Sequence, residues 1–305
     1  MTANFYIELP DRGLIALAGD DARSFLQGLV TNDVEAVTPS RAIYAALLTP
    51  QGKYLHDFFL FEISGCLYLD CEAARRDDLM GRLAMYRLRS KVTIEAADGQ
   101  FALFALIGDG ALDAAGLTGT GGAPGVAAPF AGGIAYIDPR NSAAGARCAV
   151  AREDAAGALG RAGFAAGARD DYERRRIALA LPDGSRDLTV ERSMPLDFGF
   201  EELNGVDFGK GCYVGQEVTS RIRNRGLVRR RLLHVAIEGA APRPGTKVKR
   251  GDIDAGEMCS AAHDAGLALI RLDVLAELAE SGGTLTAGEA RITPPITPKP
   301  ERADP

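Results

Sequence analysis

The chain has 305 residues, of which 47% are hydrophobic and 25% charged, and its formal net charge is -6 at pH 7. This composition is that of a globular protein long enough for two or three domains. No apolar run approaches the length of a membrane span. The acidic balance argues against broad coating of nucleic acid, although a local anion site is compatible with it.

The first residues, MTANFYIELPDRGLIAL, include acidic residues and lack a basic start followed by an apolar core. We therefore expect neither a secretory signal nor a transit peptide, and a cytoplasmic location. The three histidines are isolated, so we expect no metal site built from protein ligands alone. Free thiols in a reducing compartment are expected because no cysteine pair has CxxC spacing; the cysteines are Cys66, Cys71, Cys148, Cys212 and Cys259.

Apolar and alternating runs predict a strand-rich first part of the chain. The expected strands cover residues 5–9, 13–18, 43–48, 54–63, 67–71, 91–96 and 101–108. The turn sequence Thr-Pro-Gln-Gly at 49–52 joins the third and fourth of these into a hairpin. Apolar residues at helical spacing predict one helix that begins near Ala22 and a second that covers 73–89.

The middle of the chain is rich in alanine and glycine, so residues 108–168 are expected to be rich in loops. A strand at 134–138 and helices at 149–157 and 170–179 are expected there and just beyond, followed by an irregular stretch at 187–209. Short strand candidates at 230–237, 246–249, 256–260, 267–272 and 291–293 predict a small β barrel or sandwich. The proline-rich residues 293–305 are expected to form a flexible tail.

The most informative stretch is Lys-Gly-Cys-Tyr-Val-Gly-Gln-Glu at 210–217. Cys212 lies beside glycine, close to Lys210, and ahead of an arginine-rich run. Nearby cations lower the pKa of a thiol, and the thiolate is the form that attacks electrophiles or binds metals. The alternative is a buried structural thiol, the usual fate of a free cysteine. We favour a functional thiol at Cys212 and a structural role for the other four cysteines.

The residues after Cys212 are polar and then cationic. In an extended segment Gln216 and Glu217 would point to opposite faces, so that one could bind a ligand and the other an arginine; the alternative is a surface turn. Arg221, Arg223 and Arg225 would share one face of a strand. Arginine forks fit carboxylates and phosphates. The run, which continues with Arg229, Arg230 and Arg231, could therefore hold a carboxylate-rich ligand, an RNA backbone or acidic residues of this chain.

His56 and Asp57 follow the turn at 49–52. An aspartate at this point could receive a ligand amine, and the alternative is an ordinary strand with one polar face. The sequence has no Walker loop, no GxGxxG before a helix and no nucleophile elbow. Phosphoryl transfer, Rossmann-type redox chemistry and α/β-hydrolase chemistry therefore have no motif support.

At residues 210–217 the chain resembles the YgfZ/GcvT-like folate-binding family, which is related to the T-protein (aminomethyltransferase) of the glycine cleavage system. Further segments that resemble this family cover nearly the whole chain. They are residues 19–34, 47–61, 86–92, 138–140, 195–197, 205–208, 221–226 and 266–275.

The resemblance implies an α+β fold with mainly antiparallel sheets. It implies a three-lobed, GcvT-like module around a central folate pocket, with lobes interleaved within residues 1–228, then a β barrel at 229–292 and the tail at 293–305. It further implies binding of tetrahydrofolate or a related reduced folate. The implied role is assembly or repair of iron–sulfur enzymes, including those that thiolate tRNA. The partners expected on this basis are iron–sulfur enzymes or assembly proteins, with tRNA as a further candidate and no membrane.

Within the family the cysteine of the octapeptide is the key functional residue, which here is Cys212. The resemblance together with the local cations nominates cofactor-binding residues: Asp57, Arg176, Lys210, Gln216, Glu217, Arg221 and Arg223. Asp57 lies near the T-protein's catalytic aspartate, with His56 as the alternative at that place.

Two departures from T-proteins argue against aminomethyl transfer. T-proteins carry a pterin-contacting glutamate in an Arg-Leu-Glu-Ala-Gly-like segment, whereas residues 176–180 here read Arg-Ile-Ala-Leu-Ala, with Ala178 at the glutamate position. T-proteins also lack the cysteine of the octapeptide. Aminomethyl transfer therefore stands as an alternative to iron–sulfur maintenance, as does a tRNA-binding module that works through the arginine run.

Overall fold

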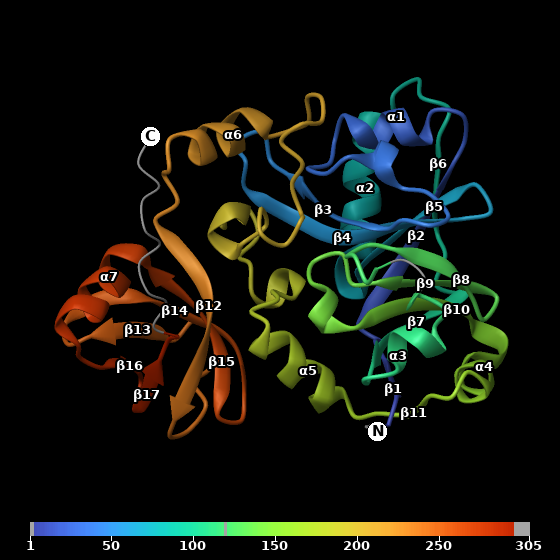
Figure 1. Cartoon of the computed structure of the whole chain (residues 1–305). Helices are drawn as coiled ribbons and strands as arrows, with labels where there is room; N and C mark the ends of the chain where they lie inside the picture. Colours follow the sequence, from blue (N-terminus) through green and yellow to red (C-terminus); the bar gives the residue numbers. More distant parts are fainter. Residues whose placement is uncertain (1–2, 119–120, 296–305) are drawn as a thin grey trace.

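Two antiparallel sheets packed face to face form the larger part of the protein (Figure 1). The computed structural model describes residues 3–118 and 121–295. One sheet has the strand order β3-β4-β5-β2-β6, with bounds Arg12–Ala18 (β2), Ile43–Leu48 (β3), Tyr54–Ile63 (β4), Cys66–Glu72 (β5) and Thr93–Ala96 (β6). The other has the order β11-β1-β7-β10-β9-β8, with bounds Phe5–Glu8 (β1), Phe101–Ile107 (β7), Ala127–Phe130 (β8), Gly133–Ile137 (β9), Ala146–Ala151 (β10) and Ala165–Ala166 (β11).

Helices cover the outer faces of both sheets. Helices α1 (Ala22–Gln27) and α2 (Arg76–Arg87) pack on the five-stranded sheet, and α3 (Ala111–Ala114) and α4 (Ala155–Arg161) pack on the six-stranded sheet. Every residue of β3 is buried because that strand has the second sheet on one face and α1 on the other. Strands covered on both faces read as continuous apolar runs, which is why 43–48 was recognisable from sequence.

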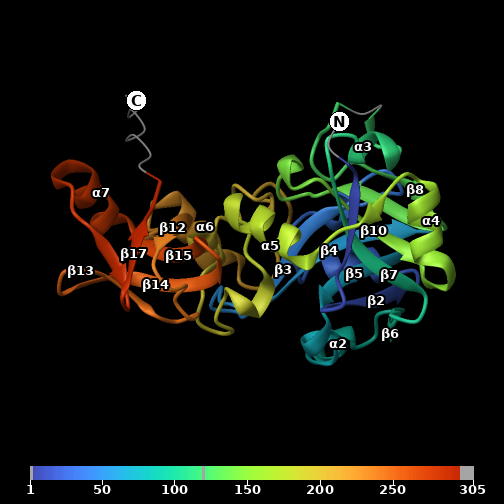
Figure 2. The ribbon, with the colours of Figure 1, turned by 90° about the horizontal axis from the view of Figure 1, so that it is seen from below.

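A closed six-stranded barrel forms the C-terminal part, with the strand order β12-β15-β14-β13-β16-β17. Its strands are Arg230–Glu238 (β12), Lys247–Arg250 (β13), Ile253–Ala262 (β14), Ala265–Arg271 (β15), Leu285–Ala287 (β16) and Ala290–Thr293 (β17). Pairing of β12 with β17 closes the barrel, and helix α7 (Leu272–Ser281) packs beside it. Figure 2 shows helix α5 (Arg169–Ala178) between the barrel and the paired sheets, and Figure 1 shows helix α6 (Gln216–Asn224) at the top, above the barrel strand β12.

Single-turn 3-10 helices occupy several connections. They are Val34–Ala36, Ala73–Arg75, Ser142–Ala144, Arg152–Asp154, Gly184–Arg186 and Pro195–Phe198. The last two lie in the long stretch between α5 and α6, and Pro195–Phe198 falls within residues 187–209, which were expected to be irregular. This stretch crosses from the paired sheets toward the barrel and supplies much of the candidate site.

The expected fold class is confirmed: the chain is α+β, its sheets are mainly antiparallel, and it ends in a barrel. Among the described strands only β1 and β11 pair in parallel. The expected helix at 149–157 is wrong, since β10 runs to Ala151 and α4 begins only at Ala155. Alanine favours helix, but pairing of β10 with β7 and β9 overrides that preference. The tail expected from 293 falls mostly on residues 296–305, outside the described residues.

A buried ion cluster lies in the layer between the two sheets. Asp70 on β5 binds Arg12 on β2 and Arg147 on β10, with an N–O distance of 2.7 Å in each pair. Phe59 lies beneath these cations, with its ring centre 4.0 Å from the guanidinium carbon of Arg147. Burial alone would raise the pKa of Asp70, but Arg12 and Arg147 hold it below its ordinary value. One carboxylate therefore ties both sheets together.

We expect Asp70→Asn to lower the free energy of unfolding by about 3–5 kcal/mol, because two buried guanidinium groups lose their charge partner. Urea unfolding at pH 7 measures this change. Because the pKa of Asp70 is lowered on folding, its contribution is present above the ordinary carboxyl pKa and is lost as pH falls through the folded value. The difference between wild type and variant should therefore shrink in acid.

The matched control is Asp77→Asn on α2, where the side chain is 86% exposed and paired only with Arg76. Exposed pairs contribute about 0–1 kcal/mol, so this variant should unfold almost as the wild type does. Equal stability of the two variants would contradict a structural role for the buried cluster.

Candidate functional site

The loop that carries Cys212 is fixed by buried hydrogen bonds rather than by regular structure. The Lys210 amine donates to the main-chain oxygens of Val30 (2.7 Å) and Asn32 (2.5 Å). The Asp207 carboxylate accepts from the main-chain N–H groups of Gly209 (2.6 Å) and Lys210 (3.1 Å). Burial lowers the pKa of Lys210 to about 8. The structure thus uses Lys210 to hold this loop against the segment that follows α1.

Two glycines allow the loop to pack against the hairpin turn at 49–52. Gly215 precedes α6 with φ at +87°, and a Cβ there would lie 2.6 Å from the main-chain oxygen of Thr49. Gly52 has φ at +73°, and a Cβ there would lie 3.2 Å from Val218. Glycine alone adopts such backbone without strain and permits this approach. The octapeptide at 210–217 and the segment at 47–61, both of which resemble the family, therefore meet in space.

Cys212 is the exposed member of the five cysteines, all of which lie within the described residues. Cys71, Cys148 and Cys259 are buried, and burial raises the pKa of each thiol, that of Cys71 to about 12. Cys66 is half-buried, and burial raises its pKa as well. A macromolecular partner or a bulky reagent can therefore reach the Cys212 thiol more readily than the other four.

Neither alternative considered for Gln216 and Glu217, an extended segment or a surface turn, is found, because Gln216 begins helix α6. Glu217 pairs with Arg221 one turn later along this helix. Side chains four apart meet on a helix, whereas residues two apart do not share a face there. The expectation failed because alternating arginines suggested a strand, although Val218 and Ile222 have the spacing of a helix face.

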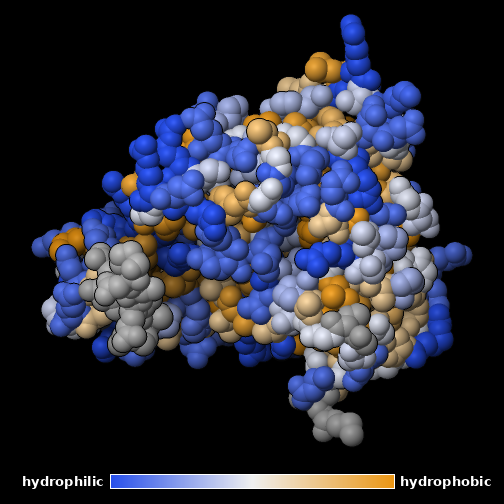
Figure 3. All heavy atoms as spheres, turned by 45° about the horizontal axis from the view of Figure 1, so that its top comes forward, coloured by the Kyte–Doolittle hydropathy of each residue, from blue (hydrophilic) through white to orange (hydrophobic). Residues whose placement is uncertain are grey.

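The arginine run divides into paired and unpaired members. Arg223 binds Glu201 at 2.6 Å and stacks 4.2 Å from the ring centre of Phe208. Arg231 likewise binds a glutamate, Glu202. The side chains without a hydrogen bond or ion pair to the residues that the structure describes are Arg225, Arg229 and Arg230. Figure 3, in which the top of Figure 1 comes forward, shows a largely hydrophilic surface on this side.

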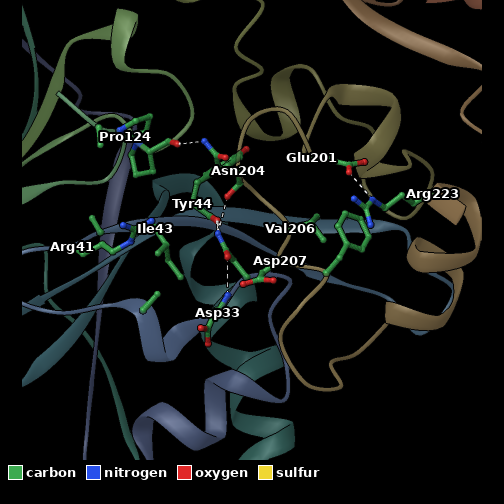
Figure 4. Close-up of a pocket in the computed structure, with 16 residues that line it drawn as sticks. Asp33, Arg41, Ile43, Tyr44, Pro124, Glu201, Asn204, Val206, Asp207 and Arg223 are labelled. Atoms are coloured by element: carbon green, nitrogen blue, oxygen red, sulfur yellow. Dashed lines mark hydrogen bonds and ion pairs between the residues drawn. The ribbon is translucent and has the colours of Figure 1, made fainter. Parts of the chain in front are cut away.

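A cavity of about 620 Å³ lies between the edge of the five-stranded sheet and the segment at 201–208. Figure 4 shows Arg41 and Pro124 on one side of this cavity and Glu201 and Arg223 on the other. Asn32 stabilises its floor by donating to the main-chain oxygens of Tyr44 and Asn204, each at 2.7 Å. Arg41 is exposed, and its guanidinium has no bond to the described part of the chain. The cavity thus has at its edge an arginine, Arg41, that forms no ion pair with the described residues.

Asp57 lies behind the Tyr44 side chain, in the layer between the sheets. The hydroxyls of Tyr44 and Tyr54 each donate to its carboxylate at 2.8 Å, and burial raises the pKa of Asp57. His56 points to the opposite face of β4, where Nε2 lies 2.8 Å from Asp78 on α2, and burial lowers its pKa to about 4. Of these two candidates, only Asp57 is connected to the cavity, through Tyr44.

Arg176 lies at the junction of α5 with the barrel, not at the cavity. Its guanidinium donates to Glu173 (2.7 Å), to Asp187 (3.0 Å) and to Ser260 on β14 (2.7 Å). With its donors satisfied by protein oxygens, Arg176 fastens the barrel to α5. Ala178, at the end of the same helix, is exposed and offers no carboxylate.

The structure therefore brings together only some of the nominated residues. The 210–217 loop, Arg223 and the cavity adjoin through the shared segment at 201–210, whereas Arg176 is separate. Sequence reasoning missed Arg41, Tyr44 and Phe208, because isolated residues on unrelated segments carry no local pattern. Among the described residues no group of three or more His, Cys, Asp or Glu could hold a metal ion. No helix in the described ranges is long and apolar enough to cross a bilayer.

Comparison with known proteins agrees with this architecture. Residues 7–116 match the GCVT N-terminal domain family, and residues 229–299 match the C-terminal β-barrel domain of CAF17. The solved structure of the glycine cleavage system aminomethyltransferase T from Bartonella henselae superposes with a TM-score of 0.75, covering 97% of this chain and 85% of that one at 16% identity. The protein is thus a GcvT-fold protein with a C-terminal barrel.

Proteins related in sequence show which family within this class the chain belongs to. The mitochondrial iron-sulfur cluster assembly factor IBA57 of Homo sapiens is 33% identical over 281 residues, which cover 86% of this chain and 76% of the human protein. The Mus musculus protein of the same name is 31% identical over 290 residues, covering 88% and 77% respectively. The chain belongs to the IBA57 family of iron-sulfur cluster assembly factors.

The GcvT-like part of the expected relationship is confirmed, while assignment to YgfZ itself stays a prediction. The expected cytoplasmic location is contradicted, because the names of these relatives describe them as mitochondrial. The expectation came from the first residues, which do not resemble a signal or transit peptide, and from scattered cysteines, which indicate a reducing environment; neither feature distinguishes one such compartment from another.

Two glycines in the same loop give a test of how it is held. We expect Gly215→Ala to destabilise the protein by about 1–3 kcal/mol, because alanine is strained at positive φ and its Cβ would strike the Thr49 oxygen. Urea unfolding and the alkylation rate of Cys212 are the measurements. Gly211→Ala is the control, since a Cβ there meets no atom within 4 Å. Equal effects of both changes would show that the packing against the hairpin turn does not position the loop.

Proposed function

We propose that this protein supports iron–sulfur cluster assembly through the Cys212 thiol and binds a reduced folate in the cavity beside it. The observation that carries the first part is the exposure of Cys212 on an anchored loop, while the remaining cysteines are buried or half-buried. Its family relatives are named as iron-sulfur cluster assembly factors, which supports the same role.

With Cys212 as its one functional thiol, the protein could not hold an iron–sulfur cluster without ligands from another molecule. Iron–sulfur clusters usually take four cysteine ligands, and in the described part of the chain Cys212 belongs to no group of three or more His, Cys, Asp or Glu that could hold a metal ion. Cys212 would therefore share a cluster or a sulfur atom with ligands from another molecule. An iron–sulfur assembly protein is the partner that fits this requirement.

The cavity has properties that suit a folate. Its volume of about 620 Å³ lies within the range of small-molecule sites. Phe208, which is half-buried, supplies aromatic surface for a pteridine or a benzoyl ring, and the exposed Arg41 supplies a cation for the glutamate carboxylates. A bound reduced folate would supply a one-carbon carrier. Asp57 would act on it only through Tyr44, whose hydroxyl it holds.

Aminomethyl transfer has less support than this role. The likeness to aminomethyltransferase T rests on 16% identity and so concerns the fold alone. The exposed Ala178 provides no carboxylate for a pterin. RNA binding through the arginine run is also less supported than it was from sequence, since Arg221, Arg223 and Arg231 are paired with glutamates.

For the thiol, we expect Cys212→Ser to fold normally and to lose the ability to restore iron–sulfur enzyme activity in cells that lack this protein. An exposed, isosteric change should alter the free energy of unfolding by no more than about 0.5 kcal/mol. Cys66→Ser changes a half-buried cysteine on β5 and serves as the control. Full restoration of enzyme activity by Cys212→Ser would rule out the thiol as the functional group.

For the folate, we expect saturable binding of 5-formyltetrahydrofolate in calorimetric titration. Arg41→Ala should weaken it about fivefold, the loss of roughly 1 kcal/mol for an exposed ion pair. 6-Methyltetrahydropterin, which lacks the benzoyl-glutamate and has no carboxylate, should bind both proteins equally. Arg243→Ala, which removes an exposed cation from the barrel, is the control. Absence of saturable binding would refute the folate proposal and leave the thiol proposal standing.

A further inference from the structure

The C-terminal end of helix α2 exposes an unusual group of apolar side chains. Met85 is 69% exposed, Tyr86 41% and Leu88 88%. These three are consecutive or nearly so, whereas the other large exposed apolar side chains in the described residues are scattered. Scattered exposed apolar residues need no explanation, but a contiguous group indicates a contact surface. We call residues 85–89 the α2 tip.

The α2 tip rests on an anchored connection rather than a loose loop. The main-chain N–H of Lys91 donates to the Asp21 carboxylate at 2.8 Å, and that of Ser90 donates to the Arg87 oxygen at 2.8 Å. Gly19 lies so close to this connection that a Cβ on it would be 2.1 Å from the Lys91 oxygen. Val92, immediately after, is buried in the core under the five-stranded sheet. The exposed side chains are therefore presented in a fixed position.

Leu88 ends the helix with φ at +43° and ψ at -108°. A residue with a Cβ is strained at positive φ, and glycine commonly occupies this position after a helix. The side chain is 88% exposed, so burial within this chain does not compensate the strain. Strained backbone of this kind gathers at functional sites. Leucine at 88 is thus better explained by a contact outside the chain.

The charges around the α2 tip define what it would contact. Arg87 and Arg89 are exposed and form no side-chain hydrogen bond or ion pair with the residues described here. By contrast, Arg82 on the preceding turn pairs with Asp78, and Lys91 pairs with Asp20. Arg87 and Arg89, which form no ion pair with the described residues, thus lie on either side of the exposed Leu88. Arginine, tyrosine and methionine are enriched at the centres of protein interfaces.

We propose that the α2 tip docks into an acidic surface of a partner protein. Leu88 and Met85 would enter an apolar pocket of the partner, and Arg87 and Arg89 would pair with carboxylates at its rim. A second copy of this chain fits less well, because a symmetric contact would bring two cationic tips together. An anionic lipid surface also fits less well, because the chain carries a net charge of -6.

This surface is separate from the proposed thiol and folate sites. No residue of the α2 tip lines the cavity or belongs to the loop at 210–217. The proposal therefore stands or fails independently of folate binding and of the role of Cys212.

The test begins with a photo-crosslinking amino acid in place of Met85 in the full-length protein, expressed in the cells from which the gene comes. The same amino acid in place of Ile253, a 48% exposed side chain on the barrel, is the control. We expect a discrete crosslink from position 85 to a protein with an acidic surface and none to that protein from position 253.

The captured protein is then purified and titrated with unmodified wild type and variants. We expect Leu88→Gly, which also relieves the positive-φ strain, to weaken binding at least tenfold without loss of thermal stability. Arg89→Glu should weaken binding by a similar factor, and raising the salt concentration should weaken wild-type binding. Ile253→Ser and Arg243→Glu are matched controls and should bind as the wild type does.

Several results would overturn the proposal. They are the absence of any crosslink from position 85, a crosslink only to lipid, RNA or a second copy of the chain, and a captured protein whose affinity is unchanged by Leu88→Gly and Arg89→Glu.

Discussion

The structure depends on one buried carboxylate. Asp70 lies between Arg12 of its own sheet and Arg147 of the opposing sheet, with almost no contact with water. Apolar packing between two sheets tolerates some sliding, whereas a carboxylate with guanidinium groups on both sides fixes their relative position. Such a group adds little net stability compared with apolar residues, and its role here is better described as specifying one arrangement. Tyr44 and Asp57, behind the cavity, lie in the same layer.

Buried cations fix two further junctions in the same way. Lys210 joins the cysteine loop to the segment after α1, and Arg176 joins the barrel strand β14 to α5. Lys210 was a candidate cofactor ligand because positive charge near a reactive cysteine suggests an anion, and Arg176 was a candidate because residues 176–180 resemble the pterin-contacting segment of T-proteins. In the structure their donors are satisfied by carbonyl and carboxylate oxygens of the chain. Of the cations that remain available, Arg225 belongs to the arginine run that the sequence pointed to, whereas Arg41 gave no comparable signal.

Local patterns predicted the elements whose neighbours in sequence are also neighbours in space. The hairpin of β3 and β4 and most barrel strands follow from turn residues and alternating side chains. The failures are elements decided by distant contacts. β10 consists largely of alanine and becomes a strand because β7 and β9 are on either side of it, and α6 becomes a helix although its arginines alternate. The cavity could not be predicted, because its walls come from five separate segments.

Cys212 and Leu88 are both exposed, and in both cases the neighbouring backbone is held in place by contacts with the rest of the fold. Cys212 follows a buried lysine and precedes a glycine that no other residue could replace without strain, and Leu88 precedes a connection held by Asp21 and Gly19. Ordering such segments costs conformational entropy that neither exposed side chain offsets by packing within this chain. Under the two proposals made above, the Cys212 thiol and the Leu88 side chain would both gain their contacts from other molecules. The anchored backbone beside each of them would then serve to present it in a fixed place to a partner.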